Sequence, residues 1–175
     1  LESMGSDTLA IKDMAGLLTP QSTKELVSLL SKNISIPIHV HSHATAGLAS
    51  LNLIAAVEAG ATIIDTCNSS FSEGASHPTT ESIIAALQSM GYEINIDIAA
   101  IESISEHLRE ARKKYWQFES EFTGVDPRVL SNQVPGGMIS NLSNQLKDQD
   151  ALDKMDDVLK EIPEVRKDLG YPPLV

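Results

Sequence analysis

Short apolar segments alternate with amphipathic segments along the first half of this 175-residue chain. The apolar segments are about five residues long and cover residues 8–12, 36–41 and 61–65. The segments between and after them have helical periodicity and cover residues 20–33, 47–60 and 78–90. Short strands that alternate with helices predict parallel βα units. The apolar segments lack polar alternation, which predicts that both faces of the sheet are covered.

This pattern predicts an α/β fold, namely the C-terminal part of a TIM (β/α)8 barrel. Residues 1–95 supply about three βα units, which are too few to close an eight-stranded barrel. We therefore expect about five further units upstream of Leu1, so that the chain is a fragment of a longer protein. Its first residues resemble neither a signal peptide nor a transit peptide.

The second half, residues 96–175, is predicted to be a helical extension. A long helix is expected from residue 97 to about residue 119, with a buried stripe formed by Ile98, Ile101, Ile104, Leu108 and Ala111. An irregular stretch over 118–134 follows, and Pro135-Gly-Gly then opens another helical pattern. The segments 150–162 and 163–169 are predicted as two short acidic helices with solvated faces.

The net charge of the chain argues against two classes of partner, and its cysteine content suits one kind of compartment. The chain has 24 acidic and 13 basic residues, and its net charge of −11 disfavours nucleic acid and anionic membrane surfaces. Its one cysteine, Cys67, cannot form an internal disulfide, which suits a reducing compartment. No apolar run is long enough to span a bilayer. We expect a cytoplasmic protein.

Three histidines occupy alternate positions at the end of the second apolar segment. His39, His41 and His43 project from one face if this segment is a strand, because alternate strand residues point the same way. Buried imidazoles need partners for their ring nitrogens, and a bound metal ion is one such partner. Ligation by at least two of them and purely structural roles both remain open. Zinc, cobalt and manganese are all compatible with imidazole ligands.

Lys12 ends the first apolar segment and is the second candidate site residue. Its neighbour Asp13 could neutralise its charge, which is the structural interpretation. The functional interpretation is an active-site group at the carboxyl end of a strand.

The connection from Asp65 to Pro78 is long for a loop between a strand and a helix, and it is rich in hydroxyls. Capping of the next helix by Ser76 or Thr79 is the favoured interpretation, with substrate contacts as the alternative. Cys67 is expected to be an inert small apolar residue. His77 is expected to be a surface or capping residue.

The segment from Pro135 to Asn141 reads as a helix start with two flexible glycines. No nucleophile elbow or Ser-His-Asp order accompanies Ser140, so a hydrolase nucleophile is excluded. The sequence also has no phosphate-binding loop and no dinucleotide fingerprint.

Three motifs in this order resemble the carboxyltransferase domain of biotin-dependent enzymes. They are Ile11-Lys-Asp-Met-Ala-Gly-Leu-Leu18, Ile38-His-Val-His-Ser-His-Ala-Thr-Ala-Gly47 and Val134-Pro-Gly-Gly-Met-Ile-Ser-Asn-Leu142. The resemblance covers essentially the whole chain and is to stand-alone subunits, namely the α subunit of oxaloacetate decarboxylase and the B subunit of pyruvate carboxylase. It implies a metal-dependent transfer of a carboxyl group between oxaloacetate or pyruvate and protein-bound biotin, through a pyruvate enolate.

The resemblance also implies roles for particular residues. Lys12 matches a lysine that carbon dioxide converts to a carbamate, which binds a divalent ion together with the residues matching His41 and His43. His39 is left with a supporting role. Ser140 matches a residue whose hydroxyl relays a proton between biotin and the enolate carbon. The extension over 96–175 thereby completes the active site, while an aspartate ligand and a substrate-binding arginine are expected upstream.

The partners implied by the resemblance lie outside this chain. Biotin arrives on a carrier domain, since the Ala-Met-Lys-Met attachment sequence is absent here. Membrane decarboxylase subunits or biotin carboxylase subunits are further partners of this family, and a homodimer is expected.

Two alternatives remain. The first is a metal-dependent Claisen-type synthase or lyase of the same barrel superfamily, such as enzymes acting on hydroxymethylglutaryl-CoA. The second is a non-catalytic scaffold fragment of a biotin-enzyme complex. The isolated fragment is expected to be inactive, with at most weak metal binding.

Overall fold

The computed structural model describes residues 1–119, 124–132 and 134–172. Strands and helices alternate in the first half, after the short 3-10 helix η1 (Glu2–Met4), in the order β1 (Leu9–Asp13), α1 (Pro20–Asn33), β2 (Ile38–Ser42), α2 (Ala49–Ala59), β3 (Ile63–Ile64) and α3 (Thr80–Ser89). The second half is helical and comprises α4 (Ile98–Lys113), η2 (Trp116–Phe118), α5 (Val129–Asn132), α6 (Gly136–Asp148), η3 (Leu152–Lys154) and α7 (Met155–Asp168). The predicted alternation in the first half and the helical second half are confirmed.

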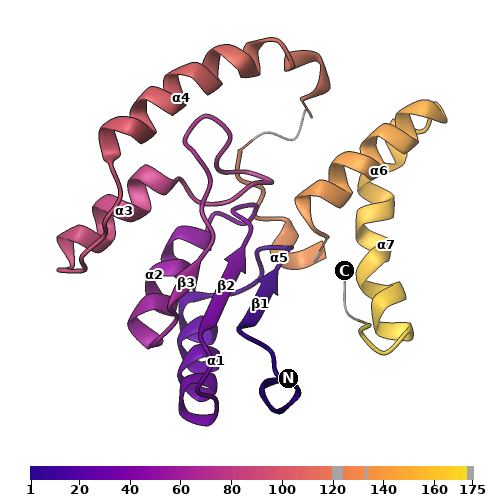
Figure 1. Cartoon of the computed structure of the whole chain (residues 1–175). Coiled ribbons are helices and arrows are strands. Elements are labelled where there is room, and N and C mark those ends of the chain that lie inside the picture. Colours follow the sequence, from indigo (N-terminus) through magenta and orange to yellow (C-terminus); the bar gives the residue numbers. More distant parts are fainter. Residues whose placement is uncertain (120–123, 133, 173–175) are drawn as a thin grey trace.

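The three strands form one parallel sheet in the order β1-β2-β3 (Figure 1). In its register Lys12 lies beside His41, while Val40 lies beside Ile64. Parallel strands end at the same edge, so the polar residues that end the strands are brought together there.

Helices α1 and α2 cover one face of the sheet, and the main core lies between this face and the helices. It consists of buried residues from both strands and helices: Val27, Ile38, Val40, Leu53, Ala56, Ala61, Ile83 and Leu87. The other face carries Ala10 and Lys12 of β1, which are exposed, and His39 and His41 of β2, which are half buried. In the described residues this second face carries polar and small side chains. Its cover stays a prediction, since it depends on the further barrel units expected upstream.

The start of α1 illustrates how local sequence sets a helix boundary. Thr19 accepts a hydrogen bond from the backbone of Ser22, and the Ser22 hydroxyl accepts one from the backbone of Thr19, which forms a capping box. Pro20 occupies the first turn, where its missing N–H costs no hydrogen bond. The observed bounds of α1 agree with the prediction.

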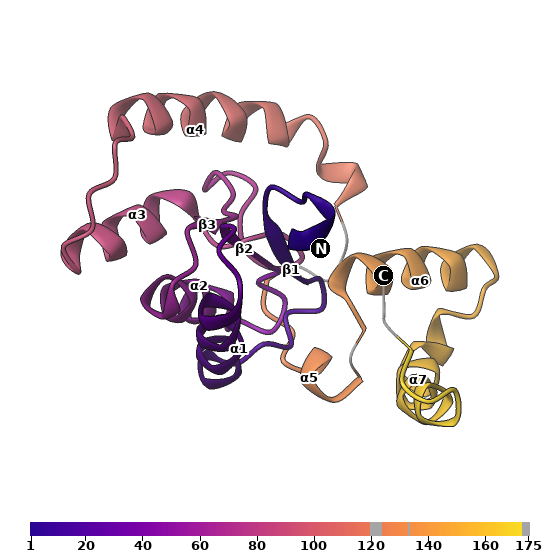
Figure 2. The ribbon, with the colours of Figure 1, turned by 60° about the horizontal axis from the view of Figure 1, so that its bottom comes forward.

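Helix α4 lies beyond the carboxyl ends of the strands, over the loop that follows β3 (Figures 1 and 2). Its predicted stripe is half buried at four of five positions, whereas Ile104 is 53% exposed and Ser105 is the fully buried residue of the helix. Polar contacts attach α4 to the rest of the chain. The Ser105 hydroxyl lies 2.7 Å from a carboxylate oxygen of Glu81, and Asn68 donates to that hydroxyl over 2.8 Å.

The two short helices predicted over 150–169 form one helix, α7, which contains Pro163. Proline cannot donate to the carbonyl four residues earlier, and this is why the sequence predicts a break there. The helix nevertheless continues through Pro163, and its turns before the proline hold Met155 and Leu159, which are buried in a small core with Val134 and Ile139.

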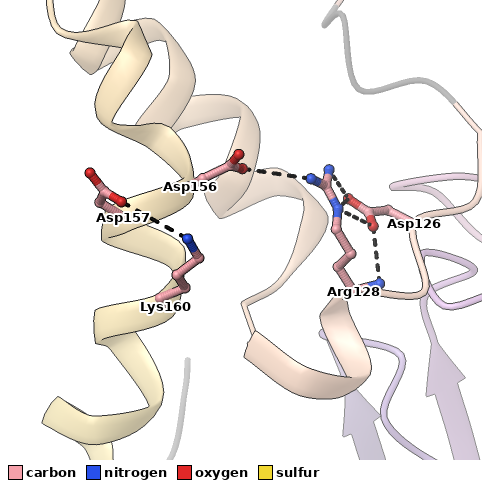
Figure 3. A network of polar contacts seen from close by, with 5 residues as sticks. All are labelled: Asp126, Arg128, Asp156, Asp157 and Lys160. Carbon is pink, nitrogen blue, oxygen red and sulfur yellow. Dashed lines mark hydrogen bonds and ion pairs between the residues drawn. The ribbon is translucent and has the colours of Figure 1, made fainter.

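The segment before α5 joins the helical extension to the sheet. The Asp126 N–H donates to the carbonyl of Thr45 over 2.7 Å, just beyond β2. The Asp126 carboxylate binds Arg128, whose guanidinium also lies 3.8 Å from Asp156 on α7 (Figure 3). Val129 is fully buried beside the loops that follow β1 and β2. The extension is thus fixed next to the edge where the strands end.

None of the helices in the described ranges has the length and apolar character that crossing a bilayer requires.

Candidate functional site

The polar residues that end the three strands lie together at one edge of the sheet. His41 is the register partner of Lys12 on β1, so both side chains project from the same face. Asp65 follows β3 directly, and its N–H donates to the carbonyl of Val40 over 3.1 Å. The described residues therefore confirm the prediction that polar groups gather at the carboxyl edge of the sheet.

Asp65 binds two of the strand histidines at once. One carboxylate oxygen lies 2.6 Å from Nδ1 of His41, and the other lies 2.8 Å from Nε2 of His39. Burial raises the pKa of the Asp65 carboxyl, but the hydrogen bonds from His41 and His39 outweigh burial and lower it. Asp65 is therefore ionised at neutral pH and acts only as an acceptor. His39 is engaged by Asp65, in keeping with a supporting role.

His43 is held by the loop that follows β3. Its Nδ1 donates to the carbonyl of Ala75 over 2.6 Å, because a carbonyl oxygen can only accept. Burial lowers the pKa of His43, and the nearby rings of His77 and His41 act in the same direction against the effect of the Ala75 carbonyl. The neutral form of His43 is favoured, with its lone pair on Nε2.

The Nε2 atoms of His41 and His43 face each other at 3.3 Å. Both Nδ1 atoms donate, since their partners can only accept. In the tautomer with neutral rings, the lone pairs of the two Nε2 atoms point into the same space. Two nitrogens bound to one tetrahedral zinc ion at about 2.0–2.1 Å lie about 3.3 Å apart, so this pair fits a divalent ion.

His77 belongs to the same cluster. Its ring centroid lies 4.3 Å from that of His41 and 4.5 Å from that of His43, and one nitrogen from each ring fits within a 4.8 Å span. The prediction that His77 is a surface or capping residue is wrong, because the loop after β3 folds back over the end of β2. Sequence patterning offers no periodic signal for this residue, since the loop has no period.

The predicted side-chain capping of α3 by Ser76 or Thr79 is wrong. Thr79 is the N-cap residue of α3 but makes no side-chain capping hydrogen bond. Its hydroxyl donates to Glu73 instead, over 3.0 Å. The carbonyl of Ser76 accepts from the N–H of Ala44, which holds the loop against the end of β2.

Lys12 is exposed at the edge of this cluster, and Asp13 does not neutralise it. Successive strand residues point to opposite faces, and Asp13 accepts hydrogen bonds on the far side from the backbone of Leu17 and Leu18 and from the hydroxyl of Ser42. The structural interpretation of Lys12 as a lysine paired with Asp13 is therefore wrong.

Ser140 falls within α6, and its side chain lies outside the described residues. Helix α6 begins one residue after Pro135, as predicted for the Pro-Gly-Gly sequence. The role of Ser140 stays a prediction.

Two family descriptions match this chain. Residues 1–108 match a family described as HMGL-like, and residues 129–175 match the "Conserved carboxylase domain". Together the two matches span the site edge and the C-terminal helices.

Curated relatives align with the whole chain. It is 52% identical to the B subunit of pyruvate carboxylase from Methanocaldococcus jannaschii, over 100% of this chain and 31% of that protein. It is 42% identical to the "Methylmalonyl-CoA carboxyltransferase 5S subunit" of Propionibacterium freudenreichii subsp. shermanii, over 100% of this chain and 35% of that protein. The chain thus spans about a third of the length of these relatives.

Solved structures match the fold over nearly all residues. The carboxyl transferase domain of Rhizobium etli pyruvate carboxylase superposes with a TM-score of 0.92 at 33% identity, covering 97% of this chain and 29% of that chain. The same domain with pyruvate and biocytin gives a TM-score of 0.90 at 33% identity, covering 95% of this chain and 28% of that chain.

Proposed function

Because this chain belongs to the HMGL-like family and ends in a conserved carboxylase domain, we propose that it is the C-terminal part of a metal-dependent carboxyltransferase domain. The proposed reaction moves a carboxyl group between oxaloacetate or pyruvate and biotin held on a protein. In this assignment residues 1–95 are barrel units and residues 96–175 are the extension that completes the active site. The carboxylase match in the second half supports this reaction over others catalysed on the same barrel.

One observation supports the proposal above all others: Lys12 lies beside His41 on the face where the Nε2 atoms of His41 and His43 converge. A cationic lysine beside a divalent ion would be repelled. Reaction of its neutral amine with carbon dioxide gives a carbamate and releases one proton, which turns the cation into an anionic oxygen ligand. Lys12, His41 and His43 are then the ligands that this chain supplies.

The ion when bound supplies a Lewis acid that polarises the keto oxygen of oxaloacetate or pyruvate; we assign zinc, cobalt or manganese to this site. The chain itself orients the ligands. Asp65 fixes the ring of His41 through Nδ1, and the carbonyl of Ala75 fixes the ring of His43. Such outer contacts set the tautomer and the ring orientation of ligating histidines.

Ser140 is the proposed proton relay. A hydroxyl can donate and accept within one step, which is what proton exchange between the biotin ureido group and the enolate carbon of pyruvate requires. In the decarboxylating direction the carboxyl group of oxaloacetate passes to biotin and the enolate carbon receives the proton. In the reverse direction the same hydroxyl returns the proton to biotin.

The biotin in this proposal is carried by a separate domain, so the partners are a biotin carboxyl carrier domain and the keto acid. Biotin carboxylase or membrane decarboxylase subunits decide the direction of transfer, and the proposed assembly contains two copies of the carboxyltransferase. The proposed compartment is the cytoplasm, where the substrates are soluble keto acids.

The match of residues 1–108 to the HMGL-like family favours one second candidate, a lyase that cleaves a hydroxymethylglutaryl-CoA type of substrate. Such an enzyme would need the histidine pair but neither biotin nor a carbamate on Lys12.

The test is oxaloacetate decarboxylation by the complete polypeptide that carries these residues, measured with and without free biotin. The Lys12→Ala variant is measured beside Lys24→Ala, a matched control at an exposed position on α1. Free biotin should stimulate the wild type and the control, and this activity should collapse in Lys12→Ala. Activity that responds to neither biotin nor Lys12, together with cleavage of hydroxymethylglutaryl-CoA, would refute the proposal in favour of the lyase.

A further inference from the structure

His77 is a third imidazole at the site, and the assignment of Lys12, His41 and His43 as ligands gives it no role. It comes from the loop after β3, far in sequence from the His-x-His pair on β2. Its ring contacts both other rings, with centroid separations of 4.3 and 4.5 Å. The ring is half buried within this cluster.

The tautomer of His77 is fixed in the same way as those of the strand pair. Its Nδ1 lies 3.0 Å from the carbonyl of Ser42, which can only accept, so Nδ1 carries the proton. The lone pair of the neutral ring is then on Nε2. Three rings therefore have the same arrangement, with Nδ1 bonded to an acceptor and Nε2 left to bind an electrophile.

We propose that His77 is a third histidine ligand of the divalent ion held by His41 and His43. This inference rests on the proposed metal site and adds a residue to it. One ligand atom from each of the three rings lies within 4.8 Å of the others, so the rings would have to approach one another further to reach the spacing of about 3 Å between neighbouring ligands of one ion. With the carbamate of Lys12 and the aspartate expected upstream, His77 would make five protein ligands, and a six-coordinate ion would keep one position for the keto oxygen.

The backbone holds His77 where this role requires it. The N–H of Glu73 donates to the carbonyl of His77 over 2.8 Å, and the N–H of Cys67 donates to that of Pro78 over 2.9 Å. Together with the contact between Ser76 and Ala44, these bonds fix both ends of the turn that carries His77. A ligand on a fixed turn loses little conformational entropy when the ion binds.

A third neutral imidazole has a chemical consequence. A neutral imidazole adds no negative charge, so only the carbamate and the aspartate expected upstream would offset the positive charge of the ion. His77 would therefore weaken the ion as a Lewis acid less than a further carboxylate ligand would.

The test separates ligation by His77 from its bond to Ser42. In His77→Asn the side-chain amide replaces Nδ1–H and keeps a donor for the Ser42 carbonyl, but the variant lacks Nε2. Cobalt(II) is titrated into the complete polypeptide, and the dissociation constant and the visible ligand-field bands are recorded. His41→Ala serves as the reference for loss of a ligand, and His107→Asn, at an exposed position on α4, serves as the matched control.

We expect His77→Asn to weaken cobalt binding by at least about tenfold and to shift the ligand-field bands, with His107→Asn unchanged. If His77→Asn keeps the wild-type affinity and bands while His41→Ala loses the metal, His77 is no ligand and the metal site itself stands. If the wild type binds no cobalt, the metal site and this inference both fail.

A second measurement needs no variant. X-ray absorption of the cobalt-loaded wild type counts coordinated imidazoles through their outer-shell scattering. Three histidines are expected, and a count of two would overturn the inference whether or not the variants fold.

Discussion

Lys12 and His41 are register partners on the adjacent parallel strands β1 and β2, so their side chains lie side by side on one face of the sheet. Asp13, the sequence neighbour of Lys12, points to the opposite face and binds the hydroxyl of Ser42 over 2.8 Å. Lys12 thus lies beside His41 with no carboxylate from its own strand on that face. This separation supports the proposed carbamate at Lys12.

The first prediction is that metal binding depends on carbon dioxide through Lys12. Stripping bicarbonate and carbon dioxide from the buffer should weaken metal binding by the wild type, because the lysine returns to its cationic form. Lys12→Ala should bind metal weakly at every bicarbonate concentration. Isothermal titration with cobalt(II) at several bicarbonate concentrations measures both effects, and equal dependence in wild type and variant would contradict the carbamate.

The second prediction concerns Asp65, which holds the ring of His41 through a 2.6 Å hydrogen bond. Asp65→Asn replaces an ionised acceptor by a neutral amide, so the tautomer and orientation of His41 are less well fixed. We expect metal affinity to fall by about 10- to 100-fold, as for other outer partners of ligating histidines. Asp7→Asn, an exposed position with the same change of charge, is the control and should bind as the wild type does.

The parts of the site that the sequence predicts are those placed by strand periodicity. His39 and His41 share a face because alternate strand residues do, and Lys12 joins them because parallel strands end at one edge. His77 could not be found in this way, since a loop has no period and its path is set by contacts to β2 that are distant in sequence. A histidine shortly after a glycine in a long βα loop is the available signal, and it is too weak alone.

The fold likewise has features that the local sequence predicts and features that it does not. Helix α1 has its predicted bounds because a capping box and Pro20 mark its start locally. Helix α7 continues through Pro163 although the local sequence favours a break there, so the local signal does not set the length of this helix. The predicted stripe of α4 is only half buried, and polar contacts such as that between Ser105 and Glu81 attach the helix.

The third prediction tests this polar attachment of α4. Glu81 accepts from the Ser105 hydroxyl and from the backbone N–H of Ser69. Burial raises the pKa of Glu81, but these hydrogen bonds together outweigh burial and lower it.

Glu81→Gln keeps the shape of the side chain but loses its charge, so α4 should detach more readily and its amides should exchange faster. Hydrogen exchange over residues 98–113 measures this, with the exposed Glu106→Gln as the control. Unchanged protection in Glu81→Gln would mean that these bonds do not hold α4.

The fourth prediction is a pH dependence at the junction with α7. Hydrogen bonds from Arg128 lower the pKa of Asp126, and burial opposes them only in part. A carboxyl whose pKa is depressed by folding stabilises the fold above its unfolded pKa of about 4. This contribution is lost as the pH falls through the lower, folded value.

Arg128→Ala should therefore lower the melting temperature at about pH 6, and the difference from the wild type should shrink below about pH 4. The effect should be small, about 1 kcal/mol or less, because the Arg128 side chain is 56% exposed. Thermal melts at several pH values give the difference directly. A difference that stays constant down to about pH 3 would show that Asp126 is not the titrating partner.

The last prediction concerns the contact between the loop after β2 and the helical extension. Gly47 has a positive φ of 78°, and a Cβ added there would lie 2.9 Å from Cγ1 of Val125. Gly91 has a similar φ of 91° but no atom within 4 Å of its added Cβ. Alanine at either position incurs the backbone strain, of order 1 kcal/mol, while only Gly47→Ala also displaces Val125. Gly47→Ala should therefore lower the melting temperature more than Gly91→Ala, and adding Val125→Ala should recover the excess. If the two glycine variants melt together, the segment around Val125 does not pack on the site edge as described.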